Sequence, residues 1–159
     1  MHTFTDTLGR VWTIHVTVDT IKRVRALTGT DLLTVAGGDL LERLSTDPVL
    51  LADVVYAVIQ PEAETRQVSD IDFGRALAGD AISSATAAML EDLVDFFPAP
   101  KRALLAKALG KLTEMQNALM AAASARVEAL DATSLADQAL TPGTSSGASP
   151  ASSAAIPAA

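Results

Sequence analysis

The sequence predicts a mainly α-helical fold, in which an N-terminal β-hairpin packs on a helical bundle and a long C-terminal helix leads into a disordered tail. Alanine and leucine dominate the 159 residues, and both lose little side-chain entropy in a helix. Apolar and polar residues alternate strictly only near the N-terminus; later, apolar residues recur every three or four positions. We expect one domain over residues 1–140. Residues 141–159 carry no charge and are rich in Ala, Ser, Pro and Gly, so they cannot offset their ordering entropy.

Residues 3–18 have the pattern of a β-hairpin. The stretch "VWTIHVTV" alternates, and a glycine turn in "DTLGR" separates it from a short first strand, "TFT". An isolated two-stranded hairpin is marginal in water, so its apolar face must pack on the helices. That face carries Trp12, Ile14, Val16 and Val18.

Capping residues mark where the next helices begin and end. Asp19 or Thr20 can cap a helix that Gly29 stops. Asp39 and Glu42 have the spacing of a capping box, which predicts a second helix start.

A stronger helix start follows at Asp47 and Pro48, which supply a side-chain acceptor and a preset φ. We expect this helix to end at Gln60, because Pro61 disfavours a helical residue before it. The stretch "PEAETRQ" is then predicted to be a polar loop.

The stretch "VSDIDFGRALAGDAI" contains two patterns that suggest an ion site. Asp72-Phe73-Gly74 matches the magnesium motif of protein kinases, but the Gly-rich loop, strand lysine and catalytic loop of a kinase are missing. Counted from Asp70, the twelfth position of a calcium loop would be Ala81 instead of glutamate. Both ion sites are therefore excluded.

The same stretch is better explained as a helix start. Ser69 stands at the N-cap with Asp72 three residues later, and Val68 and Phe73 occupy the two positions of a hydrophobic staple. We expect residues 69–97 to be helical, with a bend at Gly79-Asp80.

No constellation of residues predicts catalysis, a cofactor or a metal, so we expect a protein that is not an enzyme. The chain has no cysteine, which removes disulfides and thiolate sites. His2 and His15 lack partners at zinc-ligand spacing, and we expect both to be solvated. We also expect the acids Glu91, Asp92 and Asp95 to form a solvated helix face.

Net charge and hydropathy limit the kinds of partner that the sequence predicts. The net charge is −7, which disfavours nucleic acid. The chain has no apolar run of 18 residues, and its first residues lack the layout of a signal peptide. These observations predict a soluble, cytoplasmic protein with no membrane contact.

The last helix is expected from Pro100 to about Asp131, with a basic beginning. Lys101, Arg102, Lys107 and Lys111 precede its first acid, Glu114. These cations could pair with the acids at the end of the preceding helix, or they could face an acidic partner. Both interpretations remain open.

This helix is too long for a small core to cover. Apolar residues recur along it at helical spacing, and its distal part is rich in Ala and Met, whose surfaces adapt to irregular partners. A core stripe or a dimer contact would give the same pattern. The residues that we predict to contact a partner are Leu105, Leu109, Leu112, Met115, Leu119 and Met120.

Over residues 3–115, the order of segments resembles the small tail assembly chaperones of long-tailed bacteriophages. A short strand pair, "FTDTLGRVWTIHVTV", precedes helical blocks such as "DPVLLADVVYAVI" and "DFGRALAGD", and a helix with a basic start and a polar tail follow. The resemblance implies a non-enzymatic protein in the host cytoplasm that coats the tape measure protein, helps to recruit tail tube subunits and is absent from the mature virion. In many relatives a ribosomal frameshift yields a longer form. The alternative is a small structural or adaptor protein retained in the virion.

Overall fold

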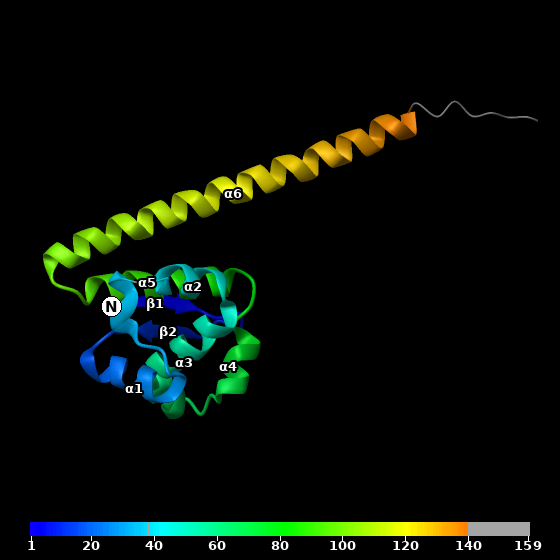
Figure 1. Cartoon of the computed structure of the whole chain (residues 1–159). Helices are drawn as coiled ribbons and strands as arrows, with labels where there is room; N and C mark the ends of the chain where they lie inside the picture. The colour runs from blue at the N-terminus through cyan, green and yellow to red at the C-terminus, as the bar shows by residue number, and fades with distance from the viewer. Residues whose placement is uncertain (38, 140–159) are drawn as a thin grey trace, which may run out of the picture. The chain divides into compact units, whose positions relative to one another are not determined.

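The computed structural model describes residues 1–37 and 39–139, and side chains up to residue 130; the predicted tail over 141–159 lies outside these residues. The described part is mainly helical, with the N-terminal hairpin and long C-terminal helix that the sequence predicts (Figure 1). The chain divides into two units after Gln116. The elements are β1 (His2–Thr5), β2 (Val11–Ile14), α1 (Val18–Thr28), the 3₁₀ helix η1 (Leu32–Ala36), α2 (Leu40–Thr46), α3 (Pro48–Thr65), α4 (Asp70–Ala76), α5 (Asp80–Asp95) and α6 (Ala99–Ala139).

The hairpin is antiparallel, with Phe4 opposite Trp12. Trp12, Ile14 and Val16 are buried as predicted. The prediction for Val18 is wrong: its side chain is 60% exposed and it is the first residue of α1. Strand β2 already ends at Ile14. The N-cap of α1 is Thr17, and not Asp19 or Thr20 as predicted; its side chain accepts the N–H of Thr20.

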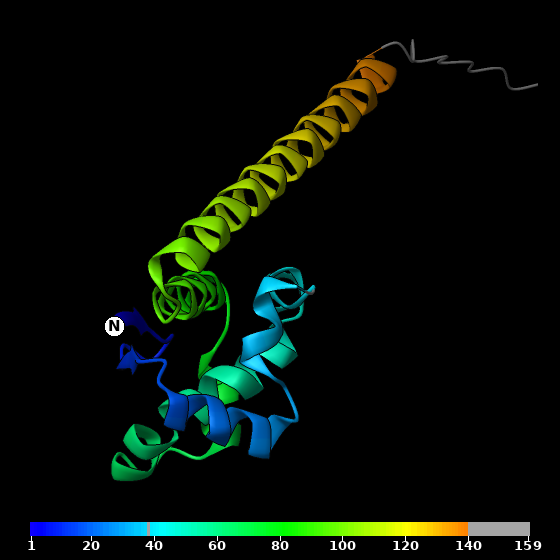
Figure 2. The same cartoon turned by 60° about the vertical axis from the view of Figure 1, so that its left-hand side comes forward.

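The hairpin contacts two helices of the N-terminal unit. β1 packs against α5 and β2 against α3 (Figure 1), while α1 packs along α3 (Figure 2). Phe73 of α4 is fully buried. Its ring contacts those of Phe4, Trp12 and Tyr56 at centroid distances of 6.4, 5.7 and 5.7 Å. The phenylalanine of the Asp-Phe-Gly stretch is therefore a core residue.

The two predicted caps around α1 and α2 have different outcomes. Gly29 ends α1 in the left-handed conformation with φ 72°, as predicted. The prediction of a capping box at Asp39 and Glu42 is wrong, because Asp39 makes no side-chain cap hydrogen bond. Its backbone, at φ −82° and ψ 5°, is not extended as an N-cap residue usually is.

Helix α3 begins as predicted but ends five residues later than predicted. The side chain of Asp47 accepts the N–H groups of Val49 and Leu50, with Pro48 at the first helical position. Pro61 lies inside the helix. The first five residues of the stretch "PEAETRQ" are therefore helical, and only its last two lie beyond α3. The helix continues because the residues after Pro61 have tertiary contacts that outweigh the lost backbone hydrogen bond.

Those contacts come from the last turn of α3 and the outer edge of β2. Ala63 is fully buried. The carboxylate of Glu62 accepts the N–H of Thr13 at 3.1 Å, and the guanidinium of Arg66 donates to the carbonyl of Val11 at 2.7 Å. The two side chains also form an ion pair at 2.6 Å. They thereby cover a strand edge that would otherwise present unpaired backbone groups.

Residues 69–97 form two helices instead of one bent helix. Ser69 caps α4, its hydroxyl accepting the N–H of Asp72 at 3.2 Å, as predicted. The carbonyl of Ala76 at the end of α4 accepts both the backbone N–H and the hydroxyl of Thr7. Gly79 then turns the chain at φ 54° and ψ −129°, a conformation that side chains disfavour. The break therefore lies just before the predicted bend.

Candidate protein-binding surface

Helix α6 carries the residues that the sequence predicts to contact a partner. It begins at Ala99, one residue before the predicted start at Pro100, and the carbonyl of Pro98 accepts the N–H of Arg102 at 2.9 Å. It extends to Ala139, beyond the predicted end near Asp131. The first part of α6 belongs to the N-terminal unit, which ends at Gln116.

The structure separates the six predicted contact residues into two groups. Leu105 is only 3% exposed and belongs to the core, and Leu109 and Leu112 are partly buried against it. Met115, Leu119 and Met120 are 52%, 63% and 70% exposed. The first three side chains therefore pack the first part of α6 into the N-terminal unit, and the last three remain accessible.

Sequence reasoning missed Leu104, which is 63% exposed. It precedes the buried Leu105 and therefore points to a different side of the helix. The signal that could have found it is its spacing of eleven residues, about three helical turns, from Met115. Once Leu105 is assigned to the core, this spacing places Leu104 and Met115 on one exposed side.

The lysines on this part of α6 are not neutralised by the acids of α5. Lys107 and Lys111 are exposed and form no hydrogen bond or ion pair within the described part of the chain. Lys101 lies over the ring of Phe97 at 4.0 Å, and Arg102 donates from Nε to the carbonyl of Phe97 at 3.1 Å. No ion pair therefore joins these cations to the preceding acids among the described residues.

The acids at the end of α5 have other partners. Asp92 is buried, so the prediction that it lies on a solvated face is wrong. Its carboxylate accepts the N–H of Val16 and pairs with the amino group of Met1. These contacts join both ends of the hairpin region to α5, which accounts for the burial of an acidic side chain.

His2 bridges the two neighbouring acids. Its Nδ1 lies 3.0 Å from Glu91 and its Nε2 lies 3.1 Å from Asp95, so the side chain, which is 29% exposed, is paired with acids and only partly solvated. The contact with His2 holds the pKa of Asp95 below its ordinary value, with a smaller contribution from the charge of Arg102. His15 is exposed, as predicted.

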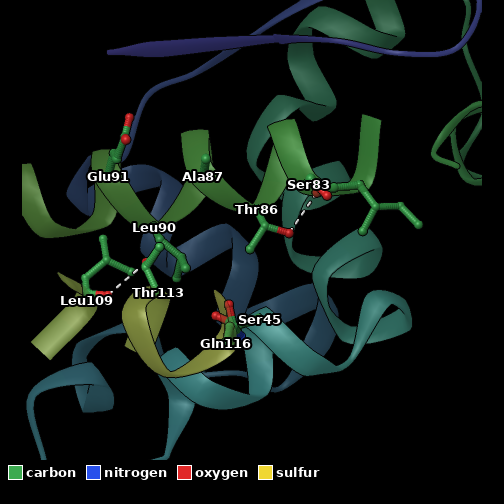
Figure 3. A pocket seen from close by; sticks show the side chains of 10 residues that line it. Ser45, Ser83, Thr86, Ala87, Leu90, Glu91, Leu109, Thr113 and Gln116 are labelled. Atoms are coloured by element: carbon green, nitrogen blue, oxygen red, sulfur yellow. Dashed lines mark hydrogen bonds between the residues drawn. The ribbon is translucent and has the colours of Figure 1, made fainter. Parts of the chain in front are cut away.

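A groove of about 350 Å³ lies between α2, α5 and the first part of α6 (Figure 3). Its polar rim includes Ser45, Thr86 and Thr113. Each of these hydroxyls donates to a carbonyl in its own helix, at 2.8, 2.7 and 3.0 Å respectively. Because their protons are already used, these three hydroxyls can act toward a ligand only as acceptors.

The described residues provide no evident metal centre. Among the residues whose side chains the structure describes, 1–37 and 39–130, no group of three or more His, Asp or Glu residues could hold a metal ion. No helix in these ranges is long and apolar enough to cross a membrane. No protein-family model, curated protein or solved structure matches the chain. The candidate functional surface is therefore defined by physical features of α6.

Proposed function

We propose that the protein is a non-enzymatic tail assembly chaperone of a long-tailed bacteriophage, which binds the tape measure protein and aids assembly of the tail tube. The observation that carries this proposal is the number of large apolar side chains that α6 leaves exposed. These are Leu104 and Met115 in the N-terminal unit, and Leu119, Met120, Val127 and Leu130 in the part of α6 that follows it.

These side chains are surplus to the core of the N-terminal unit. That core is already built around fully buried large side chains such as Trp12, Phe73 and Leu51. Exposed apolar area is unfavourable by about 25 cal/mol per Å² relative to burial. An apolar client helix would bury this area.

The methionines favour a client of irregular shape. Met115 and Met120 have unbranched, polarisable side chains that adapt to different neighbours. A chaperone that coats a long apolar helix meets many local sequences and needs this adaptability. The resemblance of residues 3–115 to phage tail assembly chaperones supports the same function and supplies the identity of the client.

Co-expression with the tape measure protein of the same phage tests the proposal. An affinity-tagged copy of this chain is expected to capture the tape measure protein and to raise its soluble fraction. An untagged copy controls for binding to the resin. If the tape measure protein stays insoluble and is not captured, the proposed function is contradicted.

Purified virions distinguish the chaperone from a structural or adaptor protein. We propose that the chain acts in the host cytoplasm and is absent from the mature particle, so mass spectrometry of virions should find at most a trace of it. A stoichiometric amount relative to the tail proteins would support the adaptor instead.

A further inference from the structure

The exposed side of α6 within the N-terminal unit combines apolar and basic residues. We call this side the α6 outer face and define it as Leu104, Lys107, Ala108, Lys111 and Met115. Their spacing of three and four residues places them on adjacent turns of one side of the helix. All five are exposed, whereas the core contacts of α6 come from Leu105, Leu109 and Leu112 at different positions around the helix.

The basic side chains of this face have no acidic counterpart in the described structure. Lys107 and Lys111 are one helical turn apart and have no ion-pair partner among the described residues. Glu114 is the single acid between Ala99 and Gln116, and it pairs with neither lysine. The chain as a whole has a net charge of −7, so this basic face differs in sign from the rest of the protein. Its two lysines are free to pair with carboxylates of another molecule.

We propose that the α6 outer face binds an acidic amphipathic helix. Apolar side chains of that helix would cover Leu104, Ala108 and Met115, and its carboxylates would pair with Lys107 and Lys111. The positive charges of Lys107 and Lys111 favour an acidic helix over a neutral or basic one. The flanking Leu104 and Met115, 63% and 52% exposed, favour a helix with an apolar ridge over a bare polyanion. The inference rests on the proposed function only for the identity of the protein that supplies the helix.

Two synthetic peptides test the inference on the full chain. Both are amphipathic helices about 20 residues long, long enough to span several turns, with the same Leu and Ala ridge. One carries Glu beside the ridge and the other carries Lys. Fluorescence anisotropy with labelled peptide is expected to show binding of the Glu peptide, weakening with added salt, and at least about tenfold weaker binding of the Lys peptide.

Charge reversal locates the site. The double variant Lys107→Glu, Lys111→Glu is expected to weaken binding of the Glu peptide about tenfold or more. The control is Lys22→Glu, Arg43→Glu, which makes the same change in net charge at exposed helical positions of α1 and α2; it should change the affinity less than about twofold. Circular dichroism checks that both variants keep the fold.

Several outcomes would overturn the inference. These are equal binding of the two peptides, an equal loss in the control variant, or binding of anionic phosphatidylglycerol vesicles or single-stranded DNA without binding of the Glu peptide. The peptide assay contains no tape measure protein, so its result is independent of the proposed function. Conversely, failed capture of the tape measure protein with intact binding of the Glu peptide would refute the proposed function alone.

Discussion

The buried carboxylate of Asp6 accepts a hydrogen bond from the indole N–H of Trp12 at 2.9 Å. The same side chain accepts the backbone N–H groups of Leu8 and Arg10, at 3.0 and 2.9 Å, and the Nε–H of Arg10 at 2.6 Å. One carboxylate therefore fixes the turn of the hairpin and the orientation of the largest core side chain. This arrangement accounts for the burial of an acidic residue.

Replacing Asp6 by Asn is expected to destabilise the N-terminal unit by about 3 kcal/mol, because the guanidinium of Arg10 loses its buried counter-charge. Urea denaturation followed by circular dichroism measures the change. Asp39→Asn is the matched control: Asp39 is exposed and makes no cap hydrogen bond, so its change should stay within about 0.5 kcal/mol. A loss for Asp6→Asn no larger than that of the control would contradict the role of the carboxylate.

Stability is also expected to fall in acid through Asp6. Burial raises the pKa of Asp6, but the hydrogen bonds from Trp12 and Arg10 outweigh this effect and hold the pKa below its ordinary value. A depressed folded-state pKa stabilises the fold above the unfolded pKa of about 3.9, and this stabilisation is lost as the pH falls through the folded pKa. Thermal unfolding between pH 7 and pH 2 should therefore show the gap between wild type and Asp6→Asn narrowing below about pH 4. A gap that widens in acid would refute this linkage.

Pro61→Ala is expected to stabilise the protein. Pro61 is exposed and lies inside α3, where it denies the carbonyl of Ala57 its helical hydrogen bond. Restoring the N–H should raise the free energy of unfolding by about 2 kcal/mol, after allowance for the greater entropy of the unfolded chain. Urea denaturation measures this change, and lower stability of the variant would show that the proline has a favourable contact in the fold.

Ser69→Ala is expected to cost about 1 kcal/mol of stability, the usual contribution of an N-cap. The hydroxyl of Ser69 accepts the N–H of Asp72 and donates to its carboxylate at 2.7 Å. Ser84→Ala is the control, because Ser84 is exposed within α5, where alanine is the better helix former. Guanidinium denaturation measures the free energy of unfolding of both variants. Equal stability of the two variants would contradict the stabilising role of the Ser69 cap.

Local signals predicted much of the fold. The caps at Asp47 and Ser69 and the stop at Gly29 depend on a few neighbouring residues, and the sequence was sufficient to locate them. Alternation likewise located the buried face of the hairpin. The capping box at Asp39 was wrong because its spacing in the sequence does not specify the backbone angles of the residue.

Long-range contacts explain the remaining errors. The continuation of α3 past Pro61 depends on bonds from Glu62 and Arg66 to a strand about fifty residues earlier in the chain. The burial of Asp92 depends on Val16, 76 residues away in sequence. For the candidate surface, helical spacing found the apolar side chains of α6. It did not show that Leu105 faces the core.

The most direct test of the proposed function is capture of the tape measure protein by a variant with Met115→Gln, Leu119→Gln and Met120→Gln. Glutamine preserves helix propensity and adds no charge, and the three side chains are exposed, so the fold should persist. The control is Leu27→Gln, Val49→Gln and Ile71→Gln, which changes exposed apolar residues of α1, α3 and α4. We predict that capture falls about tenfold or more in the α6 variant and stays near wild type in the control. Equal capture by both variants would contradict the assignment of α6 as the client-binding helix.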